Sequence, residues 1–419
     1  MLGASAAATT FVGFLIQWYT LTHVGPGPQT DALFAGLTVP QFIVVVASNP
    51  LAHVLVPLLA TGDRSAREGG AWAVFLLSLM GFAVLAAILA ASASLWLPLL
   101  VPGFSDSAKQ LTVRLGRIQM GGMAFMATAA VLRSAFHARN EFIWAAFSAF
   151  LASVAGLAAL VLMLPAYGVD AAAWSFTLRS ALEFILLVPA LGPFRRPAWH
   201  SPLVGATWRR IRPLVLGYSY ERTEIVLDRL LASLAPAGAL SLLYLGQQVY
   251  GAVGQVINRA VTLPVTPRLA QEAARGDWPA FQATYRRRLG WIAGVTLAAF
   301  LVVLLAGRPV LSLVFGMRNV TSEDVALLWL LMVLLAGLLH GDPTGHLLLT
   351  GFYAVGDTRT PTGIGMAMYT VGVAVKLLGT ALGGIAGLAV ATSAYYFGRS
   401  AVLYVGLRRK VQVQVRQTG

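Results

Sequence analysis

Residues 71–101 read AWAVFLLSLMGFAVLAAILAASASLWLPLLV, a run of 31 residues without a charged side chain. A helix of around 20 apolar residues crosses the hydrocarbon core of a bilayer, which is about 30 Å thick. Similar runs recur along the chain, separated by short polar segments. The sequence therefore predicts an all-α integral membrane protein with about twelve transmembrane helices. We place the spans at residues 2–23, 31–60, 71–101, 113–137, 142–165, 169–193, 213–235, 238–267, 289–307, 323–353, 361–380 and 384–407.

The composition agrees with a membrane protein. Of 419 residues, 58% are apolar and 11% are charged, whereas soluble domains have about 45–50% apolar and about 25% charged residues. The net charge of +14 is not accompanied by a nucleic-acid-binding motif, so we expect no nucleic-acid partner. The chain has no cysteine, which excludes disulfides, thiol nucleophiles and cysteine metal sites.

The positive charge is distributed according to membrane topology. One set of alternate loops, together with the C-terminal tail, contains 19 of the 30 Lys and Arg residues, and the opposite set contains five. Loops rich in Lys and Arg remain in the cytoplasm. Both termini are therefore predicted to be cytoplasmic.

The two halves of the chain resemble each other. Phe136-His137-Ala138 corresponds to Phe352-Tyr353-Ala354, and Gly168-Val169 corresponds to Gly384-Ile385, both at an offset of 216 residues. The repeat predicts two six-helix lobes, related by a pseudo-two-fold axis along the membrane normal. The expected domains are an N-terminal lobe at 1–193, a cytoplasmic amphipathic linker at 194–212, a C-terminal lobe at 213–407 and a cytoplasmic tail at 408–419.

Three stretches of the sequence are similar to the lipid II flippase family, the MurJ/MviN branch of the multidrug/oligosaccharidyl-lipid/polysaccharide exporter superfamily. The resemblance covers nearly the whole chain, and its most specific part is the loop after the tenth span. The matching segments are Thr30–Phe34 with Val39-Pro40 and Val56-Pro57, Asp228–Ser233 with Ala237–Ser241 and Thr262–Pro264, and Gly351–Ala354 with Gly356–Pro361.

This resemblance implies a flippase in the bacterial plasma membrane. Such a protein moves a lipid-linked saccharide, for peptidoglycan or a surface polysaccharide, to the outer leaflet by alternating access. Na⁺ or H⁺ coupling would be compatible with it, and no bound cofactor is expected. Membrane lipids are the other expected partners, and the sequence does not indicate an oligomeric state.

Two alternatives remain open. The family has cavity arginines in helices one, two and eight, where this chain reads GFLIQ at 13–17, IVVVA at 43–47 and Gln247-Gln248. A largely apolar cavity would favour an ion-coupled multidrug or small-solute exporter of the same superfamily. A membrane scaffold or a glycan ligase is the other rival, but the short external loops argue against a ligase. The chain has no phosphate-binding G-x-x-x-x-G-K-[ST] motif, and we expect it not to be an enzyme.

The span at 213–235 has the densest set of charges inside a predicted helix. Glu221, Glu224 and Asp228 form one stripe, and Arg222 and Arg229 form a second stripe about 90° away. Ionisable residues within a membrane are by default functional candidates because burying them is costly. We expect the two arginines to contact an anionic headgroup and the acids to bind a coupling cation, or the charges to compensate one another in helix packing.

The other candidates are scattered along the chain. Arg259 and Asp31 are further substrate-binding candidates. Arg259 could instead reach the membrane surface, and Asp31 could cap a helix or form part of an outer gate. In the span at 323–353, Asp342 and His346 follow a helical spacing beside Pro343, which predicts a broken helix with an ion site or a simple kink. Asp357 and Arg359 are gate candidates, and Arg179 is expected to pair with Glu183.

Overall fold

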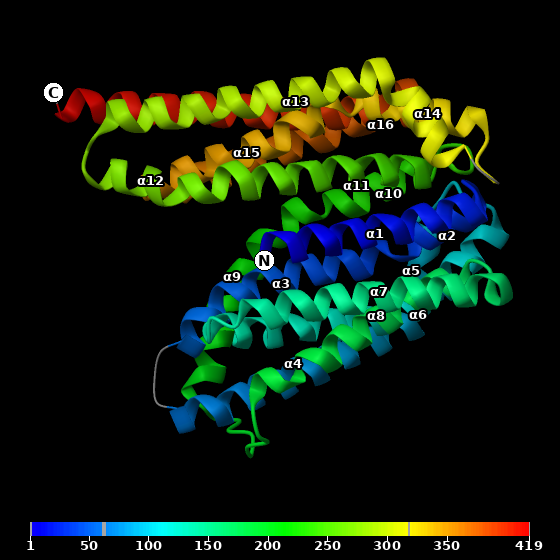
Figure 1. Ribbon diagram of the computed structural model, residues 1–419, viewed down its shortest axis with the longest axis horizontal. Helices are drawn as coiled ribbons and strands as arrows, with labels where there is room; N and C mark the ends of the chain where they lie inside the picture. The colour runs from blue at the N-terminus through cyan, green and yellow to red at the C-terminus, as the bar shows by residue number, and fades with distance from the viewer. Residues whose placement is uncertain (1, 61–63, 317–318, 419) are drawn as a thin grey trace. The chain divides into compact units, whose positions relative to one another are not determined.

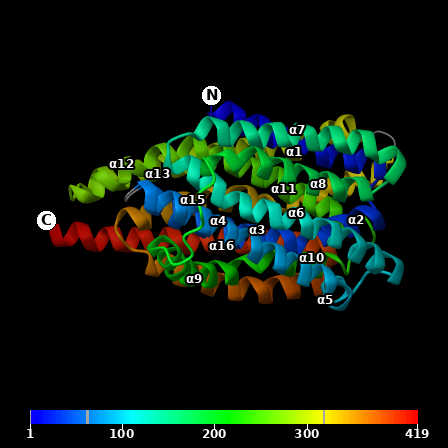
Figure 2. The ribbon, with the colours of Figure 1, turned by 90° about the horizontal axis from the view of Figure 1, so that it is seen from below.

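The computed structural model of the protein describes residues 2–60, 64–316 and 319–418. These residues form helices and short connections, and no strand occurs among them. Contacts divide the chain into two compact units, Met1–Gly238 and Ala239–Gly419. Figure 1 and Figure 2 show each unit as a bundle of long helices.

The first unit contains α1 (Leu2–Val24), α2 (Pro28–Gly36), α3 (Thr38–Ala60), α4 (Arg64–Ala91), α5 (Ala93–Leu100), α6 (Asp106–Ala138), α7 (Phe142–Tyr167), α8 (Asp170–Leu187), the 3₁₀ helix η1 (Val188–Leu191), α9 (Pro202–Arg222) and α10 (Glu224–Ala232). The second contains α11 (Ala239–Ile257), the π-helical segment η2 (Asn258–Thr262), α12 (Leu263–Ala274), α13 (Trp278–Phe315), α14 (Ser322–Leu334), α15 (Ala336–Ala354) and α16 (Arg359–Thr418).

Every predicted span falls mainly on helix, which confirms the all-α membrane fold. In the described part of the chain, seven helices are long and apolar enough to cross a membrane, or eight if the bent pair α14–α15 is one span. These candidates account for nine predicted spans, because α16 contains two. The predicted spans 2–23, 213–235 and 238–267 are also helical, but do not pass the same test of length and hydropathy. All three contain charged or amide side chains.

Helix α6 is the central helix of the first unit. It packs against α2, α3, α4, α5 and α8, and 72% of its most apolar window is buried. Small residues allow this close packing: a Cβ added to Gly36 of α2 would lie 3.0 Å from the backbone nitrogen of Gly116 in α6. The sequence of α6 can therefore be less apolar than that of its neighbours, because protein surrounds it.

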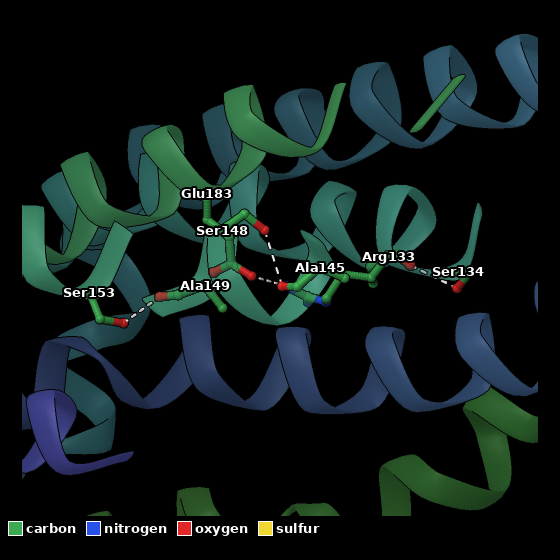
Figure 3. Close-up of polar contacts among 8 residues, drawn as sticks. Arg133, Ser134, Ala145, Ser148, Ala149, Ser153 and Glu183 are labelled. Atoms are coloured by element: carbon green, nitrogen blue, oxygen red, sulfur yellow. Dashed lines mark hydrogen bonds and ion pairs between the residues drawn. The ribbon is translucent and has the colours of Figure 1, made fainter. Parts of the chain in front are cut away.

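A buried ion pair joins α6 to α8. Figure 3 shows the guanidinium of Arg133 pointing at the carboxylate of Glu183, and Nη1 of Arg133 donates a hydrogen bond to Oε1 of Glu183. The Glu183 side chain is only 6% exposed, so the nearby opposite charge offsets part of its desolvation cost. The sequence did not predict this contact of Glu183 across the interface to α6, and the predicted pairing of Glu183 with Arg179 stays a prediction.

Helix α15 has the central place in the second unit. It packs against α11, α12, α13 and α16, and Figure 1 shows it running beside α16. A Cβ added to Gly341 would lie 2.5 Å from the carbonyl oxygen of Tyr396, so the backbones of α15 and α16 approach closely at this point. This contact requires glycine.

The break in the tenth span is not at the predicted position. Helix α15 continues through Pro343, and the 41° bend lies between α14 and α15, at Leu335. The hydroxyl of Ser393 in α16 explains this position, because it accepts a hydrogen bond from the Gly337 N–H at 2.9 Å and donates one to the Leu334 carbonyl. A side chain inserted into the hydrogen-bond ladder is a recognised cause of helix bending.

The predicted repeat reappears in the backbone of both units. Gly168 ends α7 with φ 55° and ψ −138°, and Gly384 divides α16 into two helical runs with φ 55° and ψ −135°. The positive φ explains why both positions are glycine. Helix starts also match: Ser105 caps α6 and Thr321 caps α14 through the same hydrogen bond to the third following residue.

The helix ends preserve the offset of 216 as well. The N–H of Glu141 donates to the Phe136 carbonyl at 3.0 Å, and the N–H of Asp357 donates to the Phe352 carbonyl at 3.0 Å. Asn140 and Gly356, the residues before these donors, both have positive φ. The same hydrogen bond and the same backbone conformation recur 216 residues apart, which confirms the repeat at these helix ends. The pseudo-two-fold axis stays a prediction.

The division into units differs from the predicted lobe boundary. The linker at 194–212 and the seventh span belong by their contacts to the first unit, which extends to Gly238. Helix α9 packs on α3 and α4, and α10 packs on α3 and α5. The contacts and the sequence repeat thus place the boundary between the two halves at different residues. The repeat alone would assign 213–235 to the second half.

The pairing of Arg133 with Glu183 predicts strong thermodynamic coupling. In a double-mutant cycle on thermal unfolding in detergent, Arg133→Gln and Glu183→Gln should show a coupling energy of about 1–3 kcal/mol. The matched cycle of Arg114→Gln with Glu183→Gln should show coupling close to zero, because Arg114 of the same helix α6 pairs with Asp170. Equal coupling in the two cycles would contradict the α6–α8 pair.

Candidate functional site

The charged residues of the seventh span lie on two helices. Helix α9 ends at Arg222 and α10 begins at Glu224, with Thr223 between them. Asp228 and Arg229 are buried, at 5% and 4% exposure, whereas Arg222 is exposed. The two arginines that the sequence places on one stripe therefore have different surroundings.

The exposure of each charged side chain in this span determines whether a ligand can contact it. Arg229 and Asp228 are enclosed by protein, and a buried charge is tolerated only when protein groups compensate it. Glu221 and Glu224 are half-buried. Arg222, Glu221 and Glu224 are therefore the charges of this span that a ligand or ion can reach.

Asp31 has a structural role within the first unit. It lies in the first turn of α2 with 2% exposure, and its Oδ2 accepts a hydrogen bond of 2.6 Å from the Gly238 N–H. Gly238 has φ 91°, and a Cβ there would lie 3.1 Å from the carbonyl carbon of Pro26. Asp31 thus ties the start of α2 to the end of the unit, and its assignment to a substrate site stays a prediction.

Arg259 lies in the π-helical segment η2 of the second unit, and its side chain is exposed. Single π-turns occur frequently at functional sites. The wider turn follows the amide-rich helix α11 and precedes Pro264 in α12. An exposed guanidinium here is compatible with substrate contact and with an interfacial position.

Asp342 and His346 are neighbours on α15. His346 Nε2 lies 3.7 Å from Asp342 Oδ1, and both side chains are partly exposed. A Cβ added to Gly254 of α11 would lie 2.9 Å from Asp342 Oδ2, so the carboxylate faces α11. No group of three or more His, Cys, Asp or Glu side chains suited to a metal ion occurs in the described residues. The structure thus brings the two side chains together, and their role in ion coupling stays a prediction.

Asp357 forms a compact polar cluster after α15. Its Oδ1 accepts a hydrogen bond from the Thr360 N–H at 3.0 Å, and its Oδ2 accepts hydrogen bonds from the Thr360 hydroxyl and from Lys410. Burial raises the pKa of Asp357, but the hydrogen bonds from Lys410 and Thr360 and the charge of Lys410 lower it, to about 2. Arg359, the other gate candidate, is exposed and begins α16.

Sequence reasoning missed Lys410 and Arg133 as partners. Lys410 belongs to the basic end of α16 and Arg133 to a helix end that was counted with the cytoplasmic charges. Each contacts an acid about 50 residues away, at Asp357 and Glu183 respectively. The sequence shows an acid and a base in each case, but it does not show that the fold packs their two helices together.

The amino-acid sequence matches a known protein family over most of its length. A family model described as lipid II flippase MurJ matches residues 22–418, nearly the whole chain. The chain belongs to the lipid II flippase MurJ family. The predicted resemblance is thereby confirmed, and it rests on matches that extend well beyond the three motifs.

Curated relatives agree with membership of the MurJ family. A probable lipid II flippase MurJ of Bdellovibrio bacteriovorus is 24% identical over 434 residues, which cover 100% of this chain and 83% of the relative. A lipid II flippase MurJ of Burkholderia cenocepacia is 23% identical, with coverage of 92% and 78%.

Solved structures show the same fold. A lipid II flippase MurJ in an inward closed conformation superposes with a TM-score of 0.85 at 15% identity, covering 97% of this chain and 87% of that one. An inward-facing multidrug resistance MATE transporter of the MOP superfamily gives 0.80 at 13% identity, covering 98% and 96%. The two-lobe transporter architecture is therefore shared by MurJ and MATE proteins.

The Asp357 cluster predicts an acid-sensitive contribution to stability. Because the pKa of Asp357 in the folded protein is about 2, below its ordinary 3.8, the contribution is present above about pH 4 and is lost as pH falls through about 2. Thermal unfolding in detergent should show Asp357→Asn less stable than the wild type at pH 6. This difference should shrink between pH 4 and pH 2.

Glu141→Gln is the matched control, because Glu141 occupies the equivalent helix end of the first unit and is exposed. We expect little change in its unfolding temperature. An Asp357→Asn deficit that stays constant down to pH 2 would show that the depressed pKa does not stabilise the fold.

Proposed function

We propose that this MurJ-family protein moves a lipid-linked saccharide precursor, similar to lipid II, from the cytoplasmic to the outer leaflet. The observation that carries the proposal is the family match over residues 22–418. A charged headgroup cannot cross hydrocarbon unaided, because burying a charge without a partner is costly. Alternating access through a hydrated, partly charged path lowers this cost while the lipid tail remains in the membrane.

Three charged side chains of α9 and α10 that a ligand can reach support the hydrated path in this proposal: Arg222, Glu221 and Glu224. Arg222 supplies a guanidinium for phosphate oxygens, to which arginine can donate parallel hydrogen bonds. Glu221 and Glu224 are acids that a coupling cation can visit, and Asp342 with His346 forms a second exchange point for Na⁺ or H⁺. The membrane potential, about 2.3 kcal/mol per charge per 100 mV, can then supply direction.

A second candidate function is export of a drug or small solute coupled to an ion gradient. It is favoured by the amides and apolar residues at 13–17, 43–47 and Gln247-Gln248, which give few cations for a pyrophosphate. The fold itself does not separate the two functions, because it resembles both MurJ and MATE structures.

Transport in proteoliposomes tests the flippase proposal. The wild type should move lipid II, or another lipid-linked saccharide, between leaflets, and Arg222→Gln should lower the initial rate about tenfold because one charge-assisted contact is lost. Arg209→Gln is the matched control, since Arg209 is exposed on the same helix outside the predicted span.

Two results would count against the proposal. Normal flipping by correctly inserted Arg222→Gln would remove the cationic role of this residue. Failure of the wild type to move any lipid-linked saccharide, together with gradient-driven movement of a lipophilic cation, would favour the exporter.

The excess of Lys and Arg in one set of loops supports cytoplasmic termini and a cytoplasmic 194–212 segment. A membrane-impermeant maleimide added to intact cells should label Ser107→Cys and should not label Gly205→Cys. Both positions are exposed, and a Cβ added to Gly205 would meet nothing within 4 Å. The natural chain has no cysteine that would interfere. Labelling of Gly205→Cys from outside would reverse the proposed orientation.

A further inference from the structure

A groove of about 520 Å³ runs between α13, α15 and α16 of the second unit. Helix α13 contributes Arg286, Gly290 and Ala293, which are spaced four and three residues apart and therefore lie on one face. Helix α16 contributes Phe397 and Tyr404, one above the other at a distance of seven residues, or about 10 Å of helix rise. The groove thus follows the helix axes.

The two ends of the groove differ in polarity. Arg286 lies near the start of α13 and Tyr404 near the end of α16, and Figures 1 and 2 place the α12–α13 connection and the C-terminus at the same end of this unit. Ala293 and Phe397 line the other end. No acidic side chain occurs among the described residues that line the groove. A ligand with an anionic head and an apolar tail matches this distribution.

A buried hydroxyl lies between the two ends. Thr344 of α15 is 8% exposed, and its Oγ1 has no hydrogen-bond partner among the described residues. The neighbouring His340 is already engaged, because its Nδ1 lies 2.9 Å from the Thr296 hydroxyl. An unpaired buried donor costs free energy, and a ligand carbonyl beside Thr344 would remove this cost.

The helices beside the groove face outward from the protein. Only 11% of the apolar window of α13 and 17% of that of α16 are buried, compared with 72% for α6. Beyond Ala293, the same stripe of α13 continues through exposed Leu297 and Leu301. From Arg286 to Leu301 the stripe rises about 22 Å, which exceeds the about 15 Å of hydrocarbon in one leaflet.

We propose that this groove binds a membrane phospholipid with an anionic headgroup. Its phosphate contacts Arg286, an ester carbonyl accepts a hydrogen bond from Thr344, and one acyl chain lies along the stripe of Gly290, Ala293 and Leu297. Arg287 and Arg288 follow on adjacent faces of α13 and increase the local positive potential. This lipid is a resident partner and is separate from the transported substrate of the proposed function.

Native mass spectrometry of the purified full chain tests the site with phosphatidylglycerol and phosphatidylcholine as probes. The wild type should retain phosphatidylglycerol preferentially. Gly290→Leu should abolish this retention by filling the groove, and it should fold, because a Cβ at Gly290 meets nothing within 4 Å. Gly294→Leu is the matched control, since Gly294 has the same open space and does not line the groove.

The charge is tested separately. Arg286→Gln should weaken phosphatidylglycerol binding about fivefold and remove the preference over phosphatidylcholine, whereas Arg287→Gln, on another face of α13, should preserve the preference.

Retention of phosphatidylglycerol by Gly290→Leu, or equal binding of both lipids to the wild type, would overturn the proposal. Displacement of phosphatidylglycerol by equimolar lipid II would overturn it too, because the groove would then belong to the substrate. Binding by the wild type without any flipping would reject only the proposed function.

Discussion

Hydrocarbon offers no hydrogen bonds, and this constraint determines how the protein is built. Every backbone polar group in a lipid-exposed segment must be satisfied within the chain, so the spanning elements are helices. Side-chain hydroxyls follow the same rule: Thr112 and Thr128 of α6 each donate to the carbonyl four residues earlier. Charged groups need partners farther away, as Arg133 and Glu183 show between α6 and α8.

Much of the fold could be predicted because its determinants are local. Run length and hydropathy gave the spans, and the glycines at 168 and 384 marked turns whose positive φ requires glycine. The bend at Leu335 could not be predicted in this way, because it depends on the Ser393 hydroxyl of a distant helix. Pro343 gave a misleading signal, since α15 accommodates it without interruption.

The candidate site was predictable at the level of residue types. The sequence identified the charged positions of the seventh span, but not that Arg229 is enclosed while Arg222 is exposed. That difference arises from the packing of α9 and α10 on α3, α4 and α5. The partners of Glu183 and Asp357 were missed for the same reason, since each lies about 50 residues away and the choice among several arginines and lysines depends on tertiary contacts.

Comparison of the two repeats separates requirements of the fold from additions to it. Positions 160 and 376 are equivalent at the offset of 216, and both side chains are buried, yet one is leucine and the other is lysine. The Lys376 ammonium lies 5.5 Å from the centre of the Tyr395 ring. Glu141 and Asp357 are equivalent too, but only Asp357 is held by a lysine. Because leucine satisfies the same packing position, the helical frame does not require an amine at 376. Burying an amine costs free energy unless a partner compensates it, and the Tyr395 ring is such a partner for Lys376. The repeat therefore requires a buried helix position at 376 and a helix end at 357, whereas Lys376 and the contact between Asp357 and Lys410 are additions to that repeated frame.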